Sequence, residues 1–250
     1  VTQGFSYGRL ITDVALRFRD GKVSAHAVNR VVTRDVPADP AVQQLIGFFS
    51  GQAAPRAQRV VGTALAPLTH TESGGGESSL GAVIADAMLA ITHDSARAVA
   101  AFMNPGGVRA DIGAGPITFG TIFRTQPFGN QVVTESLTGR EILDLLEQQW
   151  NNPSKSAVLS VAGISYAYND SAAPGHKVID DSVRIGGQPV NPAAIYRVTT
   201  NNFLASGGDG FSEFTRGTDT SVGPTDLEAL ESYLRGRGPV GPPEQRIQRR

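Results

Sequence analysis

The stretch from Asn201 to Phe211, with the sequence NNFLASGGDGF, constrains this chain more than any other. A β-rich run, residues 195–200, leads into it, and three glycines in four positions then surround the carboxylate of Asp209. Glycine adopts positive φ at little cost, so this pattern is typical of a loop in which a ligand approaches the backbone closely. The pattern also fits a Gly-rich turn flanked by two core phenylalanines. Both interpretations stay open at this point.

Length and composition indicate a folded protein of one large domain or two small ones. The chain has 250 residues, of which 40% are apolar and 18% charged, as in ordinary globular proteins. Its formal net charge of -1 and the lack of a long basic run argue against nucleic-acid binding. The absence of cysteine excludes disulfides and thiolate metal sites. With no apolar run of about 20 residues, we expect no membrane span.

The first 58 residues predict a β-hairpin followed by a linker helix. Residues 9–18 and 23–32 flank the hairpin turn signal Asp20-Gly21. Asp39-Pro40 then supplies an N-cap and a proline at the first helical position. Residues 50–58 are a plausible linker. The chain begins with Val and no signal peptide follows, so we expect a processed or cut piece of a longer protein.

The remainder mixes strands and helices and predicts an α+β domain. Two capping boxes, Thr138–Glu141 and Thr225–Glu228, each predict the start of a helix. A third helix is predicted over residues 80–91 from the 3–4 spacing of apolar residues. We expect the Pro/Gly-rich tail from Arg237 to be at most partly ordered. The predicted strands are residues 60–68, 98–103, 131–137, 158–168, 177–185 and 195–200.

Three loops of this domain place polar or aromatic side chains beside glycine. Phe128 and Phe203 are suited to stack on both faces of a flat base. Asp209 is suited to accept hydrogen bonds from the ribose hydroxyls, and Arg109 offers a fork of donors to a phosphate or ribose oxygen. Asn104 has both a donor and an acceptor for a base edge. The glycines Gly207 and Gly208 belong to the same candidate site.

Each of these side chains also has a purely structural interpretation. Phenylalanine is usually a core residue, which applies to Phe128 and Phe203. Asp209 could close its own loop by an Asx turn, and Asn104 could brace the loop in which it lies. Arg109 could form a surface ion pair of little value. The sequence alone does not show that the three loops converge.

Three motifs in this order carry a family resemblance: NPGGVR at residues 104–109, PFGN at 127–130, and NFLASGGDGF at 202–211. Together they resemble the C-terminal domain of the secreted 5'-nucleotidase family, which includes UDP-sugar hydrolases and 2',3'-cyclic nucleotide phosphodiesterases. The resemblance covers about residues 58–248 and implies a mixed, layered α/β/β/α domain. It implies that Phe128 and Phe203 sandwich the base, that Asp209 and Arg109 hold ribose and phosphate, and that Asn104 contacts the ligand.

The chain departs from the family at two points. Many members carry an arginine three residues before Glu77, where this chain has Gly74. The family's chemistry uses two divalent metals in an N-terminal metallophosphoesterase domain, and none of that domain's ligand motifs is present here. The four histidines, His26, His70, His93 and His176, lack ligand spacing. We therefore expect no catalytic residue, metal or cofactor in this chain.

The resemblance also implies an organisation for the whole chain. Residues 1–35 resemble the closing strands of a truncated catalytic domain, residues 36–58 the interdomain linker helix, and residues 59–250 the nucleotide-binding domain. The expected partners are a nucleoside or nucleotide and the chain's own N-terminal catalytic domain, in an extracellular, periplasmic or cell-wall setting. The main alternative is a non-catalytic binding or adhesion module that kept the fold. A weaker alternative is a self-sufficient hydrolase with an unrecognised site.

Overall fold

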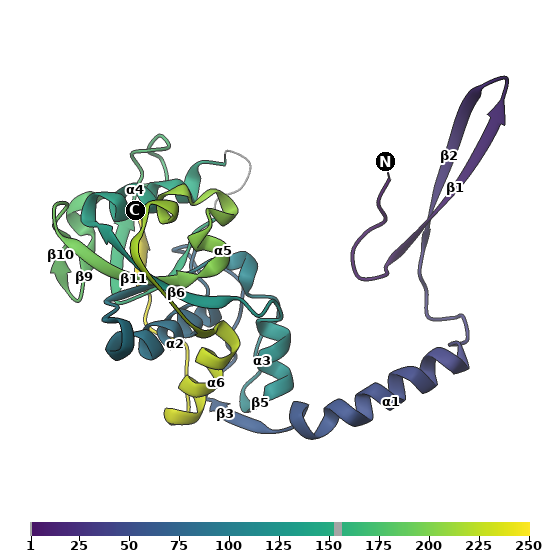
Figure 1. The fold of residues 1–250 in the computed structure, drawn as a ribbon, viewed down its shortest axis with the longest axis horizontal. Helices are drawn as coiled ribbons and strands as arrows, with labels where there is room; N and C mark the ends of the chain where they lie inside the picture. The colour runs from purple at the N-terminus through teal and green to yellow at the C-terminus, as the bar shows by residue number, and fades with distance from the viewer. Residues whose placement is uncertain (1, 153–156) are drawn as a thin grey trace. The chain divides into compact units, whose positions relative to one another are not determined.

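The computed structural model describes residues 2–152 and 157–250 (Figure 1). The chain divides into two compact units, residues 1–53 and 54–250. The first unit contains a β-hairpin and most of a helix, and the second contains every other element. Among the described residues, no helix is long and apolar enough to cross a bilayer.

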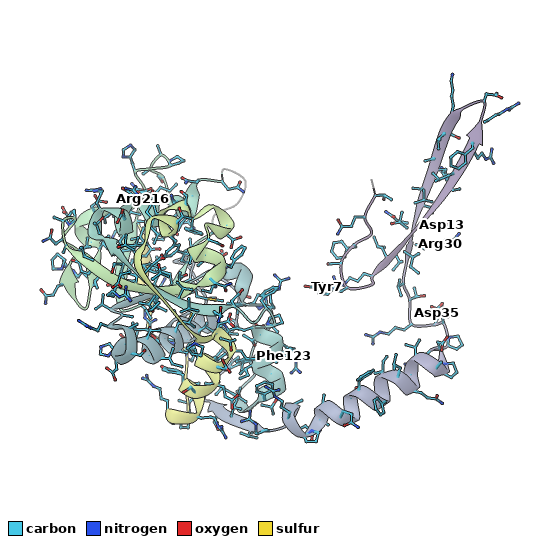
Figure 2. The ribbon with its side chains drawn as sticks, in the orientation of Figure 1. Tyr7, Asp13, Arg30, Asp35, Phe123 and Arg216 are labelled. Carbon is cyan, nitrogen blue, oxygen red and sulfur yellow. The ribbon has the colours of Figure 1, made fainter. Side chains whose placement is uncertain are left out.

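The first unit has the predicted hairpin. Strands β1 (Leu10–Arg19) and β2 (Lys22–Val31) pair antiparallel around a two-residue turn. Asp20 and Gly21 have φ of 49° and 71°, the left-handed values that a type I′ turn requires. Across the strands, the Arg30 guanidinium lies 3.5 Å from the Asp13 carboxylate (Figure 2).

Helix α1 (Pro40–Ala57) begins at the predicted N-cap and lies within the range 36–58 expected for the linker helix. The Asp39 carboxylate accepts the N–H groups of Ala41 and Val42 at 2.8 and 3.1 Å, so it is a true N-cap. The helix then continues to Ala57, through nearly all of the segment 50–58 that the sequence suggested as a linker without regular structure. The good helix formers of that segment, several alanines with glutamine and arginine, outweigh its glycine and proline.

The second unit is built around a five-stranded sheet with the order β12-β6-β11-β4-β7. A smaller sheet has the order β10-β9-β8-β13, and β3 pairs with β5. The strands are β3 (Val60–Ala64), β4 (Ala100–Met103), β5 (Gly115–Thr118), β6 (Gln131–Thr138), β7 (Ser160–Ala162), β8 (Ile164–Tyr168), β9 (Arg184–Ile185), β10 (Gln188–Pro189), β11 (Ile195–Asn201), β12 (Thr218–Thr225) and β13 (Ile247–Arg249).

The five-stranded sheet separates two hydrophobic cores. The α-helices of the second unit are α2 (Ser79–Ala96), α3 (Phe119–Thr125), α4 (Gly139–Glu147), α5 (Asn202–Ala205) and α6 (Asp226–Gly236). Along β4, Ala101 and Met103 lie in a core with α2 and α6, whereas Ala100 and Phe102 lie in a second core with α4 and β8. Figure 1 shows α2 and α6 side by side on one side of the sheet and α4 on the other. This architecture confirms the expected mixed, layered α+β fold.

Both predicted capping boxes are present. At the start of α4, Thr138 Oγ1 accepts the N–H of Glu141 at 3.2 Å, and the Glu141 carboxylate accepts the N–H of Thr138 at 2.8 Å. Thr225 and Glu228 make the same pair of contacts at the start of α6, at 3.2 and 2.9 Å. Each box satisfies backbone donors that the first helical turn leaves unpaired.

Two local predictions are wrong. The C-terminal tail is ordered: β13 pairs in parallel with β8, and Ile247 is completely buried. The Glu77 carboxylate accepts the backbone N–H groups of Arg246 and Ile247, at 2.6 and 3.1 Å. A buried carboxylate and an apolar anchor thus hold a segment whose composition indicated disorder. The predicted strand 177–185 is interrupted, because residues 180–182 form a 3-10 turn. Val178 makes an isolated antiparallel bridge to Tyr168, and the last two residues pair as β9.

The topology explains how distant loops come together. Strands β4 and β11 run parallel, with Val198 opposite Ala100, and β6 runs antiparallel to β11, with Val132 opposite Asn201. The chain therefore leaves β4, leaves β11 and enters β6 at the same end of the sheet. The three Gly-rich loops predicted from the sequence are those that emerge at this end.

Candidate functional site

A cavity of about 360 Å³ lies at this end of the sheet. Four predicted site residues, Asn104, Phe128, Phe203 and Asp209, are among its described lining residues. Arg109, Gly207 and Gly208 are not among them, although they belong to the same loops. The lining also includes three residues that the sequence reasoning did not select: Gly106, Gly107 and Asn130.

The two phenylalanines of the cavity are exposed. Phe128 is 59% and Phe203 42% accessible, whereas Phe211 at the end of the same loop is fully buried. The core interpretation therefore describes Phe211 but not the other two. Two solvent-facing rings beside one cavity, one on a loop and one on the short helix α5, suit an aromatic ligand, because stacking removes apolar surface from water on both faces of the ligand.

Two glycines shape the loop under Phe203. Gly207 has a φ of 86°, a left-handed value that favours glycine. At Gly208 a Cβ atom would lie 2.5 and 2.6 Å from two carbons of the Phe203 ring. The ring thus rests directly on the Gly208 backbone, and these glycines act through the position of Phe203 and Asp209.

Asp209 lies in a strained loop and is held by a side chain from another loop. Its φ is 55°, a left-handed value that few residues other than glycine adopt, although aspartate does so more often than most. The Asn104 amide donates to the Asp209 carboxylate at 2.8 Å and accepts from the amide of Asn201 at 3.0 Å. Asn104 therefore does brace its surroundings, and it also lies at the cavity wall.

Arg109 lies against Phe128. Its guanidinium carbon is 5.9 Å from the centre of the Phe128 ring, within the range of a cation–π contact. Its side chain also donates to the carbonyl oxygen of Gly106 at 3.4 Å. The positive group therefore flanks one of the two exposed rings, where an anionic substituent of a stacked ligand would meet it.

The loop that carries Phe128 and Asn130 is tied to two helices. The carbonyl oxygen of Asn130 accepts the N–H of Asp226, the first residue of α6, at 2.8 Å. The next N–H, from Gln131, donates to the side chain of Asn202 in α5 at 3.0 Å. Burial raises the pKa of Asp226 to about 6. Asn130 follows the phenylalanine of the PFGN motif by two positions, a signal that could have identified it.

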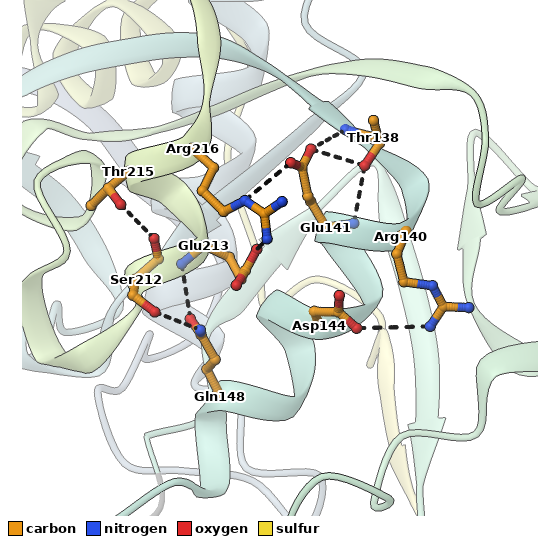
Figure 3. Close-up of polar contacts among 9 residues, drawn as sticks. All are labelled: Thr138, Arg140, Glu141, Asp144, Gln148, Ser212, Glu213, Thr215 and Arg216. Carbon is orange, nitrogen blue, oxygen red and sulfur yellow. Dashed lines mark hydrogen bonds and ion pairs between the residues drawn. The ribbon is translucent and has the colours of Figure 1, made fainter.

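The chain after Asp209 is anchored to α4. The 3-10 segment Ser212–Arg216 follows Phe211 directly. Gln148 donates to Ser212 Oγ at 2.9 Å and accepts the N–H of Glu213 at 3.2 Å (Figure 3). The Arg216 guanidinium lies 3.4 Å from Glu141 and 3.2 Å from Glu213. These contacts fix the far end of the loop that carries Phe203 and Asp209.

Gly74, which replaces the family arginine, has open space around it. A Cβ atom there would meet no atom within 4 Å, whereas one at the next residue, Gly75, would lie close against the Ile247 carbonyl oxygen. The position therefore tolerates a side chain that this sequence lacks. Within residues 2–152 and 157–250, no group of three or more His, Asp or Glu side chains is arranged to hold a metal ion.

Comparisons with known proteins identify the family to which this domain is similar. The family described as 5'-nucleotidase, C-terminal domain, matches residues 60–216. The chain is 39% identical over 168 residues to the trifunctional nucleotide phosphoesterase protein YfkN of Bacillus subtilis, covering 65% of this chain and 12% of that protein. It is 32% identical over 173 residues to the cell wall protein Lmo0130 of Listeria monocytogenes, covering 66% and 22%.

A solved structure covers nearly the whole chain. The crystal structure of a 5'-nucleotidase precursor from Thermus thermophilus matches with a TM-score of 0.77 and 30% identity, over 99% of this chain and 51% of that one. The present chain therefore spans about half of that protein and less than a quarter of the two curated relatives. On the family match over residues 60–216, the chain belongs to the 5'-nucleotidase C-terminal domain family.

Proposed function

We propose that this chain is the nucleotide-recognition part of a phosphoric-ester hydrolase. The observation that carries the proposal is the pair of exposed rings, Phe128 and Phe203, at one cavity with the Asp209 carboxylate. The rings stack on a base, Asp209 accepts hydrogen bonds from the ribose hydroxyls, and Arg109 attracts the phosphate. Binding energy gained in this way orients the phosphate ester for a reaction elsewhere in the protein.

The catalytic domain of the parent protein lies outside residues 59–250 in this proposal. Residues 1–35 are its closing strands and residues 36–58 the linker helix. The match of the Thermus thermophilus protein over 99% of this chain, and over only 51% of its own length, supports a longer parent. The two divalent metals that the family resemblance implies for such a parent would belong to that catalytic domain.

The location that we propose is outside the cytoplasm, on the cell surface or in the cell wall. It rests on the similarity to a relative named as a cell wall protein. The composition is compatible with this location, since a chain without cysteine has no thiols to be oxidised. Detection of the parent protein in culture medium or in a cell-wall fraction, and its absence from the cytosolic fraction, would support the proposal.

The function is tested by calorimetric titration of the chain with adenosine and with AMP. Phe203→Ala should weaken binding of both ligands by about 1–3 kcal/mol, the value of base–aromatic stacking, and Asp209→Ala should weaken binding by about 1.5–3 kcal/mol, the value of a hydrogen bond to a charged group. Phe123→Ala is a matched control, because Phe123 is a phenylalanine that is 50% exposed (Figure 2) but does not belong to the cavity lining. Unchanged affinity in the Asp209 variant would contradict the assigned role.

A non-catalytic binding or adhesion module is the second candidate function. The glycine at position 74, where the resemblance implies an arginine that would contact ribose or phosphate, favours it. It predicts that neither adenosine nor AMP binds the chain, and that Gly74→Arg restores binding. Binding by the unmodified chain would exclude this alternative.

A further inference from the structure

The amides of Asn201 and Asn104 link the start of α5 to the Asp209 carboxylate. Asn201 is the N-cap of α5, and its side-chain oxygen accepts the N–H of Leu204 at 2.9 Å. Its side-chain nitrogen donates to the oxygen of Asn104 at 3.0 Å, and the nitrogen of Asn104 donates to Asp209 at 2.8 Å. Asn201 is completely buried and Asn104 is 4% exposed.

The direction of this chain of hydrogen bonds is fixed at both ends. The backbone N–H of Leu204 is only a donor, so it selects the oxygen of Asn201 and turns the nitrogen towards Asn104. Asn104 must then use its oxygen to accept and its nitrogen to donate. This chain of hydrogen bonds ends at the Asp209 carboxylate, which in its ionised form can accept hydrogen bonds but cannot donate them. If Asn104 turned its amide over, two oxygens would face each other at Asp209.

Asp209 depends on this support more than an ordinary loop carboxylate would. It is exposed, it has a left-handed backbone conformation, and glycines with φ of 86° and 87°, Gly207 and Gly210, lie two residues before it and one residue after it. A loop of this kind costs free energy to hold in one conformation. The hydrogen bond from Asn104 reaches it from a segment 105 residues away in the sequence, so it joins the loops that follow β4 and β11.

We propose that Asn201 is a positioning residue for ligand recognition: through Asn104 it holds the Asp209 carboxylate ready for the vicinal hydroxyls of a ribose, and it thereby sets the preference for ribonucleosides over their deoxy forms. This inference rests on the proposed nucleoside site. Asn201 itself touches no ligand, because it is completely buried. Its effect is on which hydroxyl pattern the site accepts and not on stacking of the base.

The test compares the affinities of adenosine and 2',3'-dideoxyadenosine, which differ only in the two hydroxyls. In the unmodified chain, adenosine should bind about 10-fold or more tightly than the dideoxy compound, as expected for hydrogen bonds to a charged group. Asn201→Ser keeps an oxygen that caps α5 but does not reach Asn104. It should reduce the ratio of the two affinities to below about threefold, and Asp209→Ala should reduce it to about one.

Asn202→Ser is the matched control. Asn202 is the next asparagine, and its side chain holds the loop of Phe128 through Gln131 and not the loop of Asp209. This variant should weaken both ligands by the same factor and leave their ratio unchanged. Asn104→Ala, which removes the middle of the chain of amides, should lower the ratio as Asn201→Ser does. Adding Asn201→Ser to Asp209→Ala should change the ratio no further.

The outcomes separate this inference from the proposed function. An unchanged ratio in Asn201→Ser and Asn104→Ala, with Asp209→Ala still lowering it, would overturn the role of Asn201 alone. A wild-type chain that binds both compounds equally would overturn the role of Asp209 and of Asn201 with it. A chain that binds neither compound would overturn the nucleoside site itself, and the inference with it.

Discussion

Gly208 provides the sharpest test of how the site is built, because its role follows from distances alone. In Gly208→Ala the new Cβ would lie 2.5 and 2.6 Å from two carbons of the Phe203 ring and 2.6 Å from the Phe203 carbonyl oxygen. Ordinary van der Waals contact begins near 3.4 Å, so the Phe203 ring must move by about 1 Å. A gap of about this size already loses a large part of the van der Waals attraction between the ring and a group packed against it. The carbonyl oxygen belongs to the backbone of α5, so rotation of the side chain alone does not relieve the contact.

The displacement should remove most of the stacking of Phe203 on a base. Base–aromatic stacking contributes about 1–3 kcal/mol, so the dissociation constant for adenosine should rise about 5- to 150-fold. Calorimetric titration measures this directly. In a Phe203→Ala background the two ring contacts are gone and only the contact with the carbonyl oxygen remains, so Gly208→Ala should cost less affinity there than in the unmodified chain.

Gly113→Ala is the control, because a Cβ there meets no atom within 4 Å. It should leave the affinity unchanged. If folded Gly208→Ala bound adenosine within about twofold of the unmodified chain, the inference that Phe203 acts from the position seen in the structure would be refuted.

Two further predictions concern stability. Ile247→Ala should lower the free energy of unfolding by about 2–5 kcal/mol in urea denaturation, because Ile247 is completely buried; a loss below about 0.5 kcal/mol would mean that the tail is not docked in solution. Burial raises the pKa of Glu135 to about 7 from its usual 4.5. The protonated side chain therefore contributes to the free energy of unfolding, and this contribution is fully present below about pH 4.5 and is lost as the pH rises through 7. The total loss is on the order of 3 kcal/mol. Glu135→Gln should therefore be more stable than the unmodified chain at pH 8 and should show less loss of stability between pH 5 and 8; parallel pH profiles would contradict this.

The sequence predicts the local elements of this domain well, because their signals are local. The hairpin turn at Asp20-Gly21 and the capping boxes at Thr138 and Thr225 are each set by residues within four positions. Such motifs depend little on the rest of the chain. The prediction fails where a local hydrogen bond competes with a strand. Ser182 Oγ donates to the Ile179 carbonyl oxygen at 2.6 Å, which closes a turn inside the predicted strand 177–185.

The candidate site is predictable only in part, for a different reason. The motifs identify Asn104, Phe128, Phe203 and Asp209, but their convergence depends on β4 and β11 being parallel neighbours, with β6 antiparallel beside β11. No local pattern specifies that strand order. The positioning role of Asn201 is not predicted for a similar reason, since an asparagine directly after a predicted strand is interpreted from sequence as an ordinary helix N-cap.

The wide separation of the site's parts along the chain makes any ligand a reporter of the complete fold. Asn104 and Asp209 are 105 residues apart, so no short fragment of this unit contains both. A ligand that binds only the native state adds stability by mass action, about 2.7 kcal/mol at a concentration 100 times its dissociation constant. That gain should protect amides throughout residues 59–250 from global exchange with solvent. A variant in which the tail is undocked or a helix is unfolded should show an apparent affinity that falls in proportion to the folded fraction of the protein.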